Sequence, residues 1–199
     1  DMRYLFYKCT DFNSDLSKWN VENVLNATCM FQDCYAFNSD LSQWNVENIE
    51  DMRGMFHNCH NFNSDLSLWN VENVQYMTAM FYNCYAFNSD ISKWNVENVT
   101  NTRSMFHHCY AFNSDLSQWN VTYVTNMNGM SDMFENCPKF LNSINGFRWN
   151  KQYWKILQHS FKTRSIALYW LEQSAITSCA PGGNGRNLDL EAFNQEWVY

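Results

Sequence analysis

Two short clusters combine the imidazole and thiol groups that zinc prefers: His57, Cys59, His60 and His107, His108, Cys109. A tetrahedral zinc site needs four convergent ligands. The two clusters lie two repeats apart, and Tyr82, Cys84 and Tyr85 occupy the equivalent positions between them. We therefore expect surface histidines here and no metal.

Most of the cysteines recur in one column of a repeating pattern: Cys9, Cys34, Cys59, Cys84, Cys109 and Cys137. Eight cysteines in a small secreted protein would indicate a disulfide framework. Equivalent residues on stacked turns of chain, however, have parallel Cβ vectors and lie too far apart to bond. We expect free thiols that pack as small hydrophobic groups. Cys29 and Cys179 lie outside the column and have no predicted role.

Stacked polar columns offer further chemistry. An aspartate column, Asp15, Asp40, Asp65, Asp90 and Asp115, could cap turns by accepting backbone N–H groups, or could bind calcium between coils. Neighbouring amides of Asn20, Asn45, Asn70, Asn95 and Asn120 could form a hydrogen-bonded ladder. Glu22, Glu47, Glu72 and Glu97 form an acidic stripe that is either merely tolerated or neutralised by a partner.

These columns arise from a repeat. Trp19, Trp44, Trp69, Trp94 and Trp119 recur every 25 residues, which is typical of a solenoid, and we expect them to stack inside a right-handed coil. The Trp-Asn-Val motif predicts a short strand. The segment after it has apolar residues at i, i+3, i+6 and i+7, which predicts a helical or 3₁₀ segment. We therefore expect an α/β, leucine-rich-repeat-like solenoid, with a pure β-helix as the alternative.

The pattern M-F-x-x-C-x-x-F-N-x-D-[LI]-S-x-W-N-V-x-N-V resembles the bacterial surface protein 26-residue repeat, a Mycoplasma-type domain of unknown function found in BspA-like leucine-rich repeat surface proteins. The resemblance covers residues 1–140, with a period of 25 and an insertion near Met130 as departures. It implies surface exposure, at the cell surface or outside the cell, and binding rather than catalysis. It supplies no catalytic residues.

Two domains are expected: the repeat solenoid at residues 1–140 and a mostly helical capping segment at residues 141–199. Residues 1–6 align with residues 51–56, so the chain begins within a repeat and we expect it to be part of a longer polypeptide. In the capping segment a helix near residues 147–161 would have a basic face opposite an aromatic one. Its basic residues form a candidate partner site: Arg148, Lys151, Lys155, Lys162 and Arg164.

Charge and composition limit the function. The net charge of −7 argues against binding nucleic acid, and no apolar run approaches the roughly 20 residues that span a bilayer. No asymmetric catalytic grouping is visible, so we expect neither an enzyme nor a cofactor. The sequence favours a protein-interaction scaffold, with an adhesin or glycan-binding module, stabilised by calcium or not, as the alternative. Tyr35, Tyr85 and Tyr110 would supply its aromatic row, and an anionic membrane surface is a further candidate partner.

Overall fold

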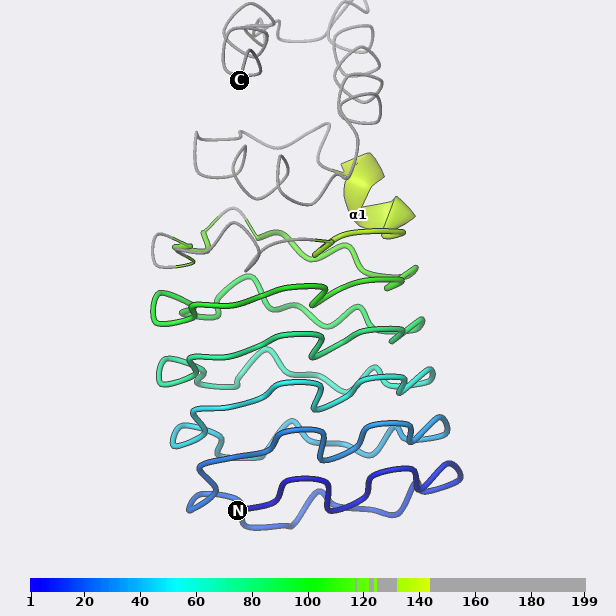
Figure 1. Cartoon of the computed structure of the whole chain (residues 1–199), viewed down its shortest axis with the longest axis vertical. Coiled ribbons are helices and arrows are strands. Elements are labelled where there is room, and N and C mark those ends of the chain that lie inside the picture. Colours follow the sequence, from blue (N-terminus) through cyan, green and yellow to red (C-terminus); the bar gives the residue numbers. More distant parts are fainter. Residues whose placement is uncertain (117, 122–123, 125–131, 144–199) are drawn as a thin grey trace, which may run out of the picture. The chain divides into compact units, whose positions relative to one another are not determined.

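The computed structural model describes residues 1–116, 118–121, 124 and 132–143. All of them belong to the first of the two units, residues 1–161 and 162–199, into which the chain divides. Each 25-residue repeat in this part forms one coil, and successive coils lie side by side (Figure 1). The described residues contain one helix, α1 (Pro138–Ser143), and no extended strand. Isolated parallel bridges instead join Asn26 to Asp51, Asp51 to Tyr76, and Tyr76 to Asn101.

One side of the stack is joined by backbone hydrogen bonds. We call residues 26–33 and their equivalents, 51–58, 76–83 and 101–108, the ladder segments. In the first of these, the N–H groups of Ala27, Cys29, Phe31 and Asp33 donate to the carbonyls of the next coil at 2.8–3.0 Å. The following coils repeat the pattern. Every one of these ladder bonds runs from a coil to its successor, so the N–H groups all point the same way.

Left-handed backbone conformations recur in every ladder segment. Two residues per ladder segment have positive φ, as Cys29 (φ 53) and Asp33 (φ 64) do in the first. The N–H groups of Met30 and Gln32, which alternate with the ladder donors, bond within the coil instead, to the Ala27 and Cys29 carbonyls at 3.1 and 3.2 Å. Gly54 also has positive φ (58), and a Cβ there would lie 3.1 Å from Sγ of Cys29. Small residues therefore suit this position.

The expected helical segment is thus replaced, among the described residues, by consecutive tight turns. The apolar residues of the predicted helical spacing do face the core: Ala27, Met30 and Phe31 are all buried. The spacing arises because each turn closes with an i→i−3 bond, as it would in a 3₁₀ helix. Positive-φ residues within the turns, such as Cys29 between Ala27 and Met30, interrupt the helix, which periodicity alone does not reveal.

The opposite side of the coil is joined by side chains. Leu41 donates its N–H to Ser64 Oγ at 2.8 Å, and its carbonyl accepts a hydrogen bond from Trp69 Nε1 at 2.9 Å. The same two hydrogen bonds, to a serine and from a tryptophan of the following coil, are made by Leu16, Leu66 and Ile91. The expected Trp-Asn-Val strand is absent from the described coils, because the backbone there bonds to side chains rather than to a neighbouring strand.

Stacked aromatic columns fill the interior. Phe56 lies 4.0 Å from Phe62 in its own coil and 5.7 Å from Phe81 in the next, measured between ring centroids. Trp44, Trp69, Trp94 and Trp119 are 2–4% exposed, whereas Trp19, in the first coil, is 39% exposed. Burial of rings this large contributes most of the apolar stabilisation of such a core.

The sixth coil keeps the cysteine column despite the insertion near Met130. Cys137 donates to the Phe106 carbonyl, as the preceding cysteines do to theirs. Helix α1 follows at once, and Phe140 packs 4.3 Å from Phe134, between ring centroids. The expected domain boundary between residues 140 and 141 falls inside α1. The helix expected near residues 147–161 lies outside the described residues. No helix of the described part is long and apolar enough to cross a membrane.

Candidate interaction surface

The cysteine column faces the core. Cys34, Cys59, Cys84 and Cys109 each donate the thiol to a phenylalanine carbonyl of the preceding coil at 3.0 Å. Burial raises the pKa of Cys34 and of Cys137 to about 12, and it raises the pKa of Cys59, Cys84 and Cys109 well above the ordinary value. Cys9, in the first coil, is exposed. The described cysteines are free, and the buried thiols are poor nucleophiles because the thiolate is disfavoured.

The aspartate column caps turns. Asp15, Asp40, Asp65 and Asp90 each accept the backbone N–H of the serine two residues ahead, at 2.9–3.0 Å. Hydrogen bonds from these serines lower the pKa of Asp15, Asp65 and Asp90. Among the described residues, no group of three or more His, Cys, Asp or Glu side chains could hold a metal ion.

The expected asparagine ladder lies elsewhere. The side chains of Asn20, Asn45, Asn70 and Asn95 accept the backbone N–H of the glutamate two residues ahead, within their own coil. Two other asparagine columns join the coils. Asn13, Asn38, Asn63 and Asn88 accept the N–H of the next asparagine in their column at 2.7–2.8 Å. Asn48, Asn73 and Asn98 donate to glutamate carbonyls of the preceding coil. The Glu22, Glu47, Glu72 and Glu97 side chains remain exposed.

The two histidine–cysteine clusters separate in space because neighbouring residues point to opposite sides of the chain. Cys59 is fully buried, whereas His57 and His60 are partly exposed. Each of these imidazoles stacks on a tyrosine of a neighbouring coil, His57 on Tyr82 and His60 on Tyr85. Their ligand atoms therefore do not converge.

An outer row of rings results. Tyr35, His60, Tyr85 and Tyr110 stack almost parallel, with centroid separations of 4.8, 4.5 and 5.1 Å. The three tyrosines are 37–43% exposed. Because the ring faces contact one another, the row presents ring edges, hydroxyl groups and an imidazole to solvent. Aromatic edges carry the positive part of the quadrupole, and the hydroxyl groups can donate hydrogen bonds.

A more buried row runs beside it. Tyr82 is sandwiched between His57 and His107 at 4.7 and 4.5 Å, between centroids. Burial lowers the pKa of both histidines and of His60. For His107 the nearby charge of Glu135, whose carboxylate lies 3.3 Å from Nε2, acts in the opposite direction. We call these two rows together the ring surface.

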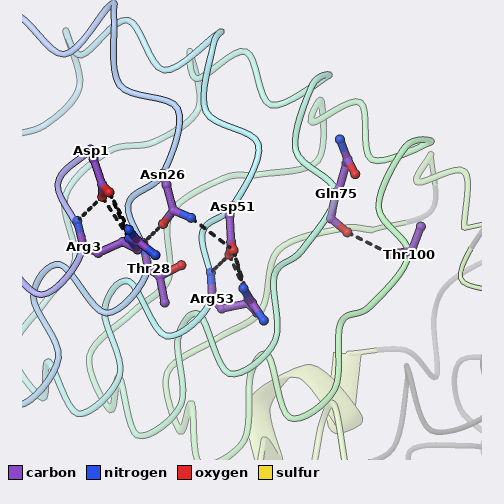
Figure 2. A network of polar contacts seen from close by, with 8 residues as sticks. All are labelled: Asp1, Arg3, Asn26, Thr28, Asp51, Arg53, Gln75 and Thr100. Atoms are coloured by element: carbon purple, nitrogen blue, oxygen red, sulfur yellow. Dashed lines mark hydrogen bonds and ion pairs between the residues drawn. The ribbon is translucent and has the colours of Figure 1, made fainter.

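A polar network lies near the start of the ladder segments (Figure 2). Arg53 holds the buried carboxylate of Asp51 through Nε and Nη2, with the closest approach 2.6 Å, and Asn26 donates to the same carboxylate at 3.4 Å. Burial alone would raise the pKa of Asp51, but hydrogen bonds and charge from Arg53 outweigh it and lower the pKa. The Arg53 guanidinium also lies 5.3 Å from the centroid of the Tyr76 ring. Asp1 and Arg3 repeat the pair two coils earlier.

Sequence reasoning identified Tyr35, Tyr85 and Tyr110 as a possible row but missed His60 within it and the inner row beside it. The available signal was variation: these columns differ from coil to coil, whereas the cysteine, serine and tryptophan columns that bond neighbouring coils do not. The basic candidates Arg148, Lys151, Lys155, Lys162 and Arg164 lie outside the described residues.

Comparison with known families gives one match. The family described as Mycoplasma protein of unknown function, DUF285, matches residues 1–88 and again residues 65–167. Together the two matches span most of the chain. Neither a curated protein nor a solved structure shows a significant match.

Proposed function

The chain belongs to the family described as Mycoplasma protein of unknown function, DUF285, and we propose that it is a non-enzymatic protein-interaction scaffold. In this proposal it forms part of a larger surface protein or assembly. Its stacked coils form a right-handed, leucine-rich-repeat-like solenoid of the BspA-like type. The proposal draws support from the contrast between columns that join the coils and columns that vary on the surface.

The single observation that carries the proposal is the ring surface. Exposed tyrosines are typical of protein interfaces because one residue offers both apolar area and a hydrogen-bonding tip. Here Tyr35, Tyr85 and Tyr110 each follow a ladder segment by two residues, and the ladder segments are bonded to their neighbours through several backbone hydrogen bonds per coil. Little conformational entropy remains to be lost when such a surface binds, which favours affinity.

The alternative, a glycan-binding adhesin, receives less support from the same rings. A glycan-binding site needs tyrosine or tryptophan side chains that a sugar can contact. In the outer row the faces of His60 and Tyr85 are already stacked on neighbouring rings at 4.5–5.1 Å, between centroids. Edges and hydroxyl groups remain, and these suit the mixed polar and apolar surface of a protein partner.

The test is site-specific photo-crosslinking in cells that produce the protein. A benzophenone amino acid at position 85 reports on the ring surface. The same amino acid at position 68 is the matched control, because Leu68 is 76% exposed and lies outside that surface. We expect discrete protein adducts from position 85 that are missing from position 68. Equal adduct patterns at both positions, or none at position 85, would contradict the proposal.

A further inference from the structure

The outer row has a property that the proposed function does not require: it is nearly symmetrical end to end. Its centroid separations are 4.8, 4.5 and 5.1 Å, so the two outer separations differ by only 0.3 Å when the row is read in reverse. These spacings also match the roughly 4.7–4.9 Å between neighbouring strands of a β-sheet. A surface with this spacing fits best against one with the same repeat.

We propose that the ring surface binds a second copy of this chain, with the two stacks antiparallel about a two-fold axis between His60 and Tyr85. Such an interface is isologous, so each contact occurs twice. Tyr35 of each copy then faces Tyr110 of the other, and His60 faces Tyr85. The inference rests on the proposed function, because it takes the ring surface to be an interaction surface.

Charge favours this surface over the others described. The whole chain has a net charge of −7, so two copies repel each other at most approaches. The exposed aspartate and glutamate columns add to that repulsion wherever they would meet. Among the described residues of the ring surface and of the column between its rows, Glu135 lies at the His107 end, 3.3 Å from His107 Nε2, and the one other carboxylate is that of Asp33. It is 9% exposed and accepts a hydrogen bond from Asn58 at 2.6 Å.

The chemistry of the rings fits the same pairing. Each row presents edges and polar tips, and tyrosine hydroxyls can both donate and accept hydrogen bonds. The hydroxyl of Tyr35 can therefore bond that of Tyr110, which also contacts His108 Nδ1 at 3.0 Å, and the Tyr85 hydroxyl can bond the His60 imidazole. Four rungs at about 5 Å give a patch roughly 20 Å long, which is small for an obligate dimer. We therefore expect a weak and reversible dimer, with a dissociation constant in the micromolar range.

Sedimentation equilibrium of the whole chain from about 5 to about 500 µM spans that range. We expect concentration-dependent dimerisation of the unaltered protein. The double variant Tyr35→Glu/Tyr110→Glu should be monomeric, because the antiparallel pairing opposes two carboxylates at each end. Tyr35→Glu/Tyr110→Lys should restore dimerisation, because each glutamate then faces a lysine of the other copy. Leu68→Glu, at an exposed site outside the ring surface, controls for added charge and should leave the dimer unchanged.

Each outcome bears on the inference. A protein that stays monomeric throughout this range overturns it. Dimerisation that survives Tyr35→Glu/Tyr110→Glu overturns it as well, as does failure of the glutamate–lysine variant to recover. The recovery also separates a lost contact from a lost fold, since both double variants alter the same two positions. If position 85 crosslinks to a different protein while the purified chain remains monomeric, the inference fails and the proposed function stands.

Discussion

Replacing Ser64 with alanine should show how much one side chain contributes to the joining of two coils. Ser64 Oγ accepts the N–H of Leu41 at 2.8 Å. Leu41 is fully buried and Ser64 is 7% exposed, so water has little access to the orphaned N–H. A buried donor without a partner costs about 1–3 kcal/mol, and the volume lost is a single oxygen atom. We therefore expect the free energy of unfolding to fall by about 1–3 kcal/mol.

Two measurements check this value. For a chain of this size the loss corresponds to roughly 2–12 °C in melting temperature. Native-state hydrogen exchange gives a local readout: the Leu41 amide should exchange roughly 5- to 150-fold faster if it exchanges by local opening. Ser14→Ala is the matched control, because Ser14 has the same place in the first coil and is exposed. A Ser64→Ala protein within about 0.5 kcal/mol of Ser14→Ala would refute the reasoning, since that is the range of ordinary surface substitutions.

Four further predictions concern the core, the thiols, acid stability and the C-terminal segment. In denaturant titrations, Trp69→Ala should lower the free energy of unfolding by roughly 3–5 kcal/mol. Trp69→Phe should lower it by less, because phenylalanine keeps most of the packing and the main loss is the hydrogen-bond donor to the Leu41 carbonyl. Cys59, Cys84 and Cys109 should react with a thiol reagent only after unfolding, and rapid reaction of the native protein would contradict their burial. Burial lowers the pKa of His57, His60 and His107, so the folded state binds fewer protons than the unfolded state; stability should therefore be complete above about pH 6.5 and fall as the pH drops below it. Urea midpoints measured from pH 7.5 to 5 check that slope, and His57→Phe/His107→Phe should flatten it. Reversing the charges of Lys151 and Lys155 should weaken partner binding most at low salt and leave the melting temperature unchanged, whereas a lowered melting temperature with unchanged binding would assign these lysines to the cap.

The period and the inward columns could be derived from the sequence because they depend on side-chain chemistry that repeats. Trp69 and Cys84 recur at fixed spacing and are apolar, so a common buried position follows. The aspartate caps could also be derived, since a short carboxylate before a turn accepts nearby N–H groups. In each case the sequence contains both the residue and its nearest partner.

The expected strand and helical segment were not found in the described coils because the deciding interactions lie between coils. Whether the Leu41 N–H bonds to a backbone carbonyl or to Ser64 Oγ depends on how far apart neighbouring coils lie. The positive φ of Cys29 and Ala79 carries no signal in those residue types, although Gly54 in the same column hints at it. Likewise, the His60 stack between two tyrosines requires knowing that residues 25 apart are neighbours and that their rings lie flat on one another.

The single direction of the ladder bonds has an electrical consequence. In ordinary β-sheets the peptide dipoles largely cancel, whereas in an α-helix they add along the axis. In the ladder segments the N–H groups of Ala27, Cys29, Phe31 and Asp33 all point toward the following coil, and each later segment adds its own in the same sense. In each coil these bonds outnumber the reverse bonds that flank the ladder segment, such as Glu50 N–H to the Leu25 carbonyl, so this side of the stack carries a net macrodipole of the helical kind, positive toward the later coils. Its moment grows with every repeat added.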